Sequence, residues 1–169
     1  MPRFLVLSLI VLVLAAGSAA AASTGAELKA VDDKFAAAFA KEDLEGVVAL
    51  YADDATVMDP GPALWYRGKA EIRKGFADFF AGVESLKLAL HDFSYTVKGD
   101  VGYSAGLFEI SFKDAKSGQM VQMSGRASSV LEKRGGKWVY VIDHASFPVP
   151  PPPGAGEEHP AEHPSGGGK

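Results

Sequence analysis

The hydrophobic pattern of this chain changes period once, and that change restricts the fold more than any other feature. Before it, apolar residues recur at helical spacing in three segments, at 24–41, 43–51 and 69–82. After it come four stretches rich in β-branched and aromatic residues, at 86–98, 101–113, 119–133 and 137–147. Glycine-containing turns such as Gly99-Asp100 separate these stretches, as they do in hairpins. Helices followed by antiparallel strands predict an α+β domain, in which a curved, mainly antiparallel four-stranded sheet wraps about three N-terminal helices.

The two ends of the chain differ from this central part. Arg3 precedes a 13-residue apolar run at 4–16, and small residues fill 17–22. This order is typical of a cleavable secretory signal, and the run is too short for a permanent membrane anchor. From residue 148 onward, 12 of 22 residues are Pro or Gly, a composition that cannot form a core. We therefore expect a periplasmic or secreted product with three parts: a signal peptide at 1–22, a domain at 23–147 and an extended or disordered tail at 148–169.

Composition excludes several classes of function. The 169 residues include no cysteine, so a disulfide, a thiolate zinc site and a cysteine nucleophile are all impossible. The formal net charge of −4 argues against nucleic acid or an anionic membrane as the main partner. The sequence contains no P-loop, no dinucleotide-binding glycine motif and no zinc-ligand spacing. We therefore expect no tightly bound metal and no cofactor.

One stretch carries a family resemblance. Residues 44–60, LEGVVALYADDATVMDP, resemble the opening of the nuclear transport factor 2-like superfamily, which includes ketosteroid isomerases and SnoaL-like cyclases. Arg67-Gly68-Lys69 before the third helical segment and Gly136-Lys137-Trp138 in the last strand agree with it. The resemblance covers about residues 26–147. It implies a cone of helices closed by a bent sheet around a pocket, and it leaves the activity open because this fold serves enzymes and binding proteins alike.

The ketosteroid isomerase motif is matched only in part. Asp59 stands at the position of the general base of that family, and Tyr51 matches a supporting tyrosine. Phe35 and Phe76 stand where the family has tyrosines, and Ser128 stands near the position of its protonated aspartate. One donor to a developing oxyanion is worth about 3–4 kcal/mol of transition-state stabilisation. The losses therefore argue against steroid isomerisation by the mechanism of that family.

Asp143 and His144 on the last predicted strand are further candidates for catalysis. In relatives of unknown function an Asp often occupies the place of Asp143, so the resemblance favours it beside Asp59. Adjacent strand residues point to opposite faces, so without a bulge only one of the pair lines a cavity. Alternation puts Asp143 with Val139, Val141, Ala145 and Phe147, and His144 with Trp138, Tyr140 and Ile142. Since both faces are largely apolar, we expect one to meet the helices and the other to form a homodimer through the sheet, as is common in the superfamily.

The sequence also offers candidates for binding a ligand. Asp59, Asp143 and His144 are the catalytic candidates, and Asp59 has the alternative role of a turn residue before Pro-Gly. Apolar and aromatic side chains typically line a ligand cavity, although the same residues serve equally well as plain core. Glu109 and Arg126 could face the pocket or form a cross-strand ion pair. The ligand-binding candidates are Tyr51, Trp65, Phe79, Tyr103, Glu109 and Arg126.

These features predict an exported SnoaL-like domain that binds a small, largely apolar molecule. If it is an enzyme, the reaction is a cofactor-free isomerisation or cyclisation with Asp59 or Asp143 as the acid or base. The alternative is a non-catalytic module for ligand binding, protein binding or dimerisation. A third hypothesis gives the working role to the Pro-rich tail, as a docking segment.

Overall fold

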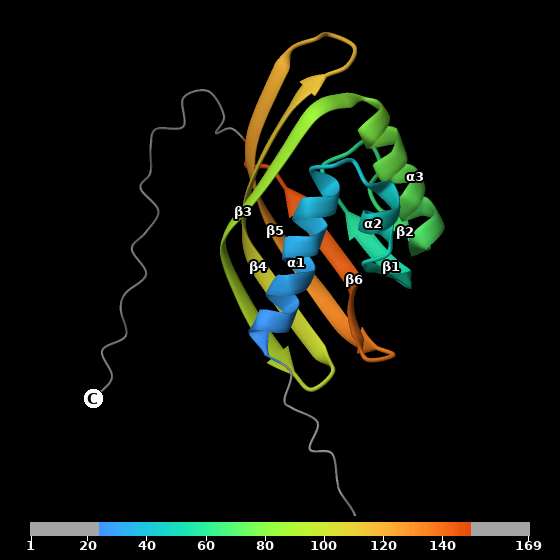
Figure 1. The fold of residues 1–169 in the computed structure, drawn as a ribbon, viewed down its shortest axis with the longest axis vertical. Coiled ribbons are helices and arrows are strands. Elements are labelled where there is room, and N and C mark those ends of the chain that lie inside the picture. Colours follow the sequence, from blue (N-terminus) through green and yellow to red (C-terminus); the bar gives the residue numbers. More distant parts are fainter. Residues whose placement is uncertain (1–23, 150–169) are drawn as a thin grey trace, which may run out of the picture.

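The computed structural model describes residues 24–149, which form three helices and one six-stranded sheet (Figure 1). The expected signal peptide and all but the first two residues of the expected tail lie outside the described residues. The helices are α1 (Gly25–Phe39), α2 (Leu44–Val48) and α3 (Gly68–Ala81). The strands are β1 (Tyr51–Met58), β2 (Tyr66–Arg67), β3 (Val83–Lys98), β4 (Val101–Asp114), β5 (Met120–Arg134) and β6 (Lys137–Ser146). Among these residues no helix has the length and hydropathy needed to cross a membrane.

The α+β class is confirmed, whereas the predicted number of four strands is wrong. The strand order is β2-β1-β6-β5-β4-β3, and the four predicted strands correspond to β3–β6. β1 begins at Tyr51, where the periodicity predicts the end of the second helix, and it pairs in parallel with β6. The hydrogen bonds that hold β1 come from β6, about 90 residues later in the chain, and a local sequence pattern does not reveal so distant a partner. The second helix consequently ends at Val48, before the predicted 51.

Local signals explain where two of the helices begin. The side chain of Glu27 accepts a hydrogen bond from the backbone N–H of Thr24 at 3.2 Å, at the start of α1. Asp43 caps α2 by accepting from the backbone N–H of Gly46 at 3.0 Å. Figure 1 shows α1 lying across the sheet, with β3 curling past it. Leu28 and Val31 on α1 are buried against that face.

A bulge in β6 overturns the predicted division of its faces. Tyr140 pairs with Leu131 and Ile142 pairs with Val130, so Val141 has no partner on β5. One unpaired residue inverts the alternation of the side chains that follow it. As a result Asp143 lies on the same inner face as Trp138 and Tyr140, while Ile142 and His144 lie on the outer face. The prediction that Asp143 and His144 face opposite ways is confirmed, and the assignment of their neighbours is wrong.

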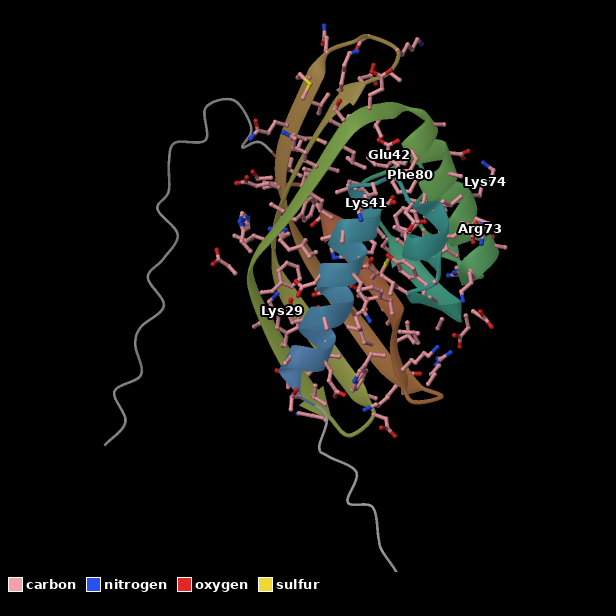
Figure 2. The ribbon with its side chains drawn as sticks, viewed as in Figure 1. Lys29, Lys41, Glu42, Arg73, Lys74 and Phe80 are labelled. Carbon is pink, nitrogen blue, oxygen red and sulfur yellow. The ribbon has the colours of Figure 1, made fainter. Side chains whose placement is uncertain are left out.

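Aromatic rings fill most of the space between the helices and the sheet. Phe39 stacks on Phe79 with ring centroids 5.6 Å apart, and it meets Phe80 edge to face at 5.4 Å. In Figure 2 Phe80 lies between α1 and α3, whereas Arg73 and Lys74 project from the outer side of α3. Phe112 contributes from β4. The pocket that the resemblance implies is reduced, among the described residues, to a narrow crevice beside α3.

Candidate functional site

Asp59 lies in the loop after β1, at a narrow crevice that has no room for a water molecule. Its Oδ1 accepts a hydrogen bond from the backbone N–H of Gly61 at 2.9 Å, so the predicted turn role is confirmed. The side chain is partly buried, and burial raises the pKa of its carboxyl above the usual range. A carboxyl in this position can exchange a proton closer to neutral pH than an exposed one. The crevice is lined by Val57, Asp59, Tyr66, Ile72, Gly75 and Phe76.

Tyr66 on β2 supplies a phenol to the same crevice. Its ring packs against α3 at Gly75, where a Cβ atom would come within 2.8 Å of the ring. Glycine at this position therefore allows the ring to approach the helix backbone. Burial, followed by the negative charge of Asp59, raises the pKa of the Tyr66 phenol. The phenol is therefore a hydrogen-bond donor, not an anion, at physiological pH.

Asp143 receives two hydrogen bonds inside the cone. The hydroxyl of Tyr51 donates to Oδ2 at 2.6 Å, and the hydroxyl of Ser129 donates to Oδ1 at 2.8 Å. Burial raises the pKa of the Asp143 carboxyl, the two hydrogen bonds oppose that rise, and Asp59 adds to it. Burial also holds the pKa of the Tyr51 phenol far above its usual value. Each carboxyl oxygen of Asp143 thus already accepts a hydrogen bond, so Asp59 is the more accessible of these two acids to a ligand.

Asp32 on α1 is a buried acid that sequence reasoning missed. It is only 3% exposed, and the hydroxyl of Tyr140 donates to its Oδ1. The hydroxyl of Tyr95 on β3 also lies close to this carboxyl, and the hydroxyl oxygen of Ser104 has no hydrogen-bond partner within residues 24–149. Burial raises the pKa of the Asp32 carboxyl, and the Tyr140 hydrogen bond opposes this. The signal was available, because position 32 falls on the apolar stripe of Leu28, Val31 and Phe35.

The two buried acids belong to one polar layer inside an apolar cone. We call Asp32, Tyr51, Ser129, Tyr140 and Asp143 the acid layer. The rings of Tyr51 and Tyr140 lie 5.2 Å apart, and each hydroxyl donates to one of the two carboxyls. A single ring, that of Phe76, lies between the acid layer and the Asp59 crevice. It lines the crevice, and its centroid lies 5.8 Å from that of the Tyr51 ring.

Four of the predicted site residues lie on the outer face of the sheet. Tyr103 is 46% exposed, and Glu109 is also exposed, so neither lines the cone interior. Arg126 and His144 meet at a separate hollow on this face. No cross-strand ion pair forms between Glu109 and Arg126, since their partners on the neighbouring strand are Ser124 and Leu107.

The other two aromatic candidates are divided between core and surface. Phe79 belongs to the ring cluster and meets Phe112 edge to face at 5.7 Å. Trp65 is 49% exposed in the loop before β2, and the guanidinium of Arg67 lies 3.9 Å from the centre of its ring. In the described part of the chain no three His, Asp or Glu side chains gather as they would around a metal ion.

Helices packed against the concave face of a strongly curved, mostly antiparallel sheet are the arrangement of the nuclear transport factor 2-like class of folds. The model of the SnoaL-like domain family matches residues 28–150, and this chain belongs to that family. The resemblance found in the sequence is thereby confirmed.

Solved structures share the fold. One is a nuclear transport factor 2-like superfamily protein from Salmonella enterica, 19% identical, with a TM-score of 0.69 over 80% of this chain and 96% of that one. A second is a protein of unknown function from Pseudomonas putida, 22% identical, with a TM-score of 0.66 over 73% and 86%. A third is a ketosteroid isomerase-like protein from Erwinia carotovora, 21% identical, with a TM-score of 0.66 over 75% and 97%. At these identities the likeness extends to the fold alone.

Proposed function

We propose that this chain is an exported domain that binds a small, largely apolar molecule at the Asp59 crevice. The observation that supports this most directly is the carboxyl of Asp59, which is desolvated among apolar groups and faces a phenol in the same crevice. In the described residues it makes a single hydrogen bond, to a backbone N–H, so one oxygen is left for a ligand. Desolvated acids in clefts are typical of functional sites.

The same geometry supports cofactor-free proton transfer in a bound ligand. Asp59 is the base that removes a proton from carbon or oxygen, and Tyr66 is the donor that stabilises the negative charge that develops. Asp143 and Tyr51 support this site from behind Phe76 without reaching the ligand. An isomerisation or a cyclisation needs no more than these groups.

Ligand entry requires the aromatic rings to move, because the crevice does not admit even a water molecule. Phe76 is the ring most directly placed to move, since it lines the crevice and separates it from Tyr51. A Phe76→Ala variant should therefore bind more of the ligand than the unmodified chain, at a cost in stability of about 3–5 kcal/mol. Unchanged binding by this variant would place the ligand elsewhere.

Native mass spectrometry of the exported protein, purified without detergent, tests the binding proposal. We expect a molecule of a few hundred daltons that is retained by the unmodified chain and lost from Asp59→Asn. The matched control is Asp53→Asn, which changes an exposed carboxylate on β1, the strand that leads to Asp59. Equal retention by Asp59→Asn and Asp53→Asn would overturn the proposal.

Incubation of the identified ligand in D₂O then separates catalysis from binding. If the site is catalytic, the unmodified chain should incorporate deuterium at carbon faster than the Asp59→Asn variant does when both proteins are saturated with the ligand, because only a carboxylate at this position can remove the proton. Equal rates for the two proteins would leave Asp59 a binding residue and exclude it as the base.

Export is part of the proposal and has its own test. The N-terminal pattern supports cleavage after Ala22, which would leave about 147 of the 169 residues. Expression of the full chain in a bacterium, followed by fractionation and intact-mass measurement, should give that shorter mass outside the cytoplasm. The full-length mass in the cytoplasm would contradict it.

A non-catalytic homodimer is the second candidate, and exposed apolar side chains on the outer face support it. Val101, Tyr103, Leu107 and Ile142 are each 44–46% exposed there. Sedimentation equilibrium at micromolar concentration should give a dimer, and Tyr103→Glu with Ile142→Glu should give a monomer. A monomer for the unmodified chain would exclude this candidate.

A further inference from the structure

The outer face of the sheet carries a hollow of about 500 Å³, on the opposite side of the strands from the acid layer. It spans β3, β4, β5 and β6, a width of about 14 Å at the usual spacing of strands. We call it the outer hollow. It is lined by Asp92, Ala105, Gly106, Leu107, Arg126, Ala127, Ser128 and His144.

Small residues and a bulge in β3 explain why this face is hollowed. Ala105 and Ser128 pair across β4 and β5 at its centre, where larger side chains would fill it. The register of β3 shifts between His91 and Ser94, and Asp92 adopts a left-handed φ of 55°. There β3 turns Phe93 inward against Gly106, whose missing Cβ leaves room for the ring. Asp92 is left at the rim of the hollow.

The hollow holds two side chains with nitrogen donors, Arg126 and His144. The Nε of Arg126 donates to the hydroxyl of Ser146 at 3.2 Å, which turns the guanidinium along the face. Within residues 24–149 Arg126 forms no ion pair, unlike Arg73 and Arg134, each of which contacts a carboxylate. His144 stands opposite Ser128, two register positions from the Arg126–Ser146 pair and therefore on the same face of the sheet.

We propose that the outer hollow binds a small organic monocarboxylate. The free nitrogens of a guanidinium match the two oxygens of a carboxylate, and the imidazole of His144 adds a third N–H donor. Leu107 and Ala105 offer an apolar wall for the rest of the molecule. Asp92 on β3 lies two strands away from Arg126, so a second carboxylate at the far end would be repelled. The expected ligand therefore has one carboxylate and a short hydrocarbon body.

Calorimetric titration of the purified full chain with acetate, butyrate, hexanoate and hexanedioate tests this chemistry, with hexanol as the uncharged control. Affinity should rise by up to about fourfold for each buried methylene. Hexanol should not bind measurably, and hexanedioate should bind more weakly than hexanoate. No saturable binding of hexanoate, or equal binding of hexanol, would overturn the proposal.

Three variants and one control locate the binding. Arg126→Gln should weaken hexanoate by at least about tenfold, because it removes a charged hydrogen-bond pair. Arg134→Gln, on the same strand but outside the hollow, is the control and should not change the affinity. Ala105→Leu should abolish binding by filling the exposed hollow. Asp92→Asn, which tolerates the left-handed backbone, should tighten binding by about twofold, the Coulomb effect of one charge at about 10 Å in water.

The result is independent of the proposed function, because Asp59→Asn should bind hexanoate as well as the unmodified chain does. If a second copy of the chain occupies the hollow instead, sedimentation will give a dimer and hexanoate will neither bind nor dissociate it. That outcome would overturn the carboxylate proposal. Retained affinity in Arg126→Gln or Ala105→Leu would also overturn it, by placing the carboxylate elsewhere.

Discussion

Acidic side chains behave in opposite ways inside the cone and on its surface. Inside, burial raises the pKa of Asp32 and Asp143 despite the hydroxyl groups that donate to them. On the surface, Arg134 holds the pKa of Asp54 below its usual range, and Arg73 does the same for Glu45. All four side chains end in a carboxyl group, so exposure to solvent and the neighbouring side chain decide whether each one keeps or loses its proton.

Packing also differs between the inner and the outer face of the sheet. The inner face is filled by rings and leaves a crevice without room for water, whereas the outer face has an open hollow of about 500 Å³. A substitution should therefore have a large effect on the inner face and a small one at the neighbouring position on the outer face. Variants on each side can test that contrast directly.

The largest contrast should come from leucines. Leu131 on β5 is fully buried, and Leu107 on β4 is 45% exposed. Leu131→Ala should lower the free energy of unfolding by about 2–5 kcal/mol, because it leaves a cavity in the core. Leu107→Ala should change it by no more than about 0.5 kcal/mol. Urea denaturation monitored by circular dichroism measures both, and similar losses would show that the outer face is covered in solution.

Removal of an acceptor from the acid layer should come next. Asp143→Ala leaves the hydroxyls of Tyr51 and Ser129 without the carboxyl that accepts from them. We expect a loss of about 1–3 kcal/mol in the free energy of unfolding. Asp92→Asn on the outer rim is the comparison and should be close to neutral. If Asp143→Ala were neutral too, water would have to replace the carboxyl, and the cone would be wetter than its packing indicates.

The pH dependence of stability should differ in sign between the two classes of acid. A raised pKa in the folded state means that Asp32 keeps a proton that the unfolded chain loses above about pH 3.9. The stabilising contribution of Asp32 to the free energy of unfolding is complete below that pH. It is lost as the pH rises through the pKa of the folded state, at up to about 1.4 kcal/mol per pH unit. Relative to the unmodified chain, Asp32→Asn should thus gain stability as the pH rises from 4 to 8.

Asp54 provides the opposite case. Its pKa is lowered by the hydrogen bond from Arg134, so its contribution is present above the unfolded pKa and is lost as the pH falls. Relative to the unmodified chain, Asp54→Asn should therefore gain stability toward low pH. Denaturation midpoints measured for both variants at several pH values give the two slopes, and slopes of equal sign would contradict the assigned environments.

These contrasts also show what the sequence could and could not predict. The helices and the four long strands follow from local periodicity, and the turn at Asp59 follows from Asp-Pro-Gly. The position of Asp32 on an apolar helical stripe could have revealed a buried acid, but the partner hydroxyl of Tyr140 comes from 108 residues later. Contacts of this range depend on the tertiary fold, and no local pattern indicates them.

The bulge at Val141 is the clearest limit to prediction from the sequence. Alternation alone assigns Asp143 to a face with Val139 and Val141, and one unpaired residue moves it beside Tyr140. Nothing in the local sequence marks that position, since valine is an ordinary strand residue. The parallel pairing of β1 with β6 is equally non-local, and it places Tyr51 within reach of Asp143. The acid layer therefore depends on two features that only the assembled sheet provides.

The smallest contrast involves two adjacent serines on β5. Ser129 donates to Asp143 on the inner face, and Ser128 lies in the outer hollow. Ser129→Ala should cost about 1 kcal/mol in the free energy of unfolding because one oxygen of Asp143 loses its donor, and Ser128→Ala should cost less than about 0.5 kcal/mol. Since the two substitutions remove the same atom from neighbouring positions on one strand, strand propensity cancels in the difference. Equal costs would mean that the Ser129 hydrogen bond adds nothing to stability, and the acid layer would then depend on Tyr51 alone to hold Asp143.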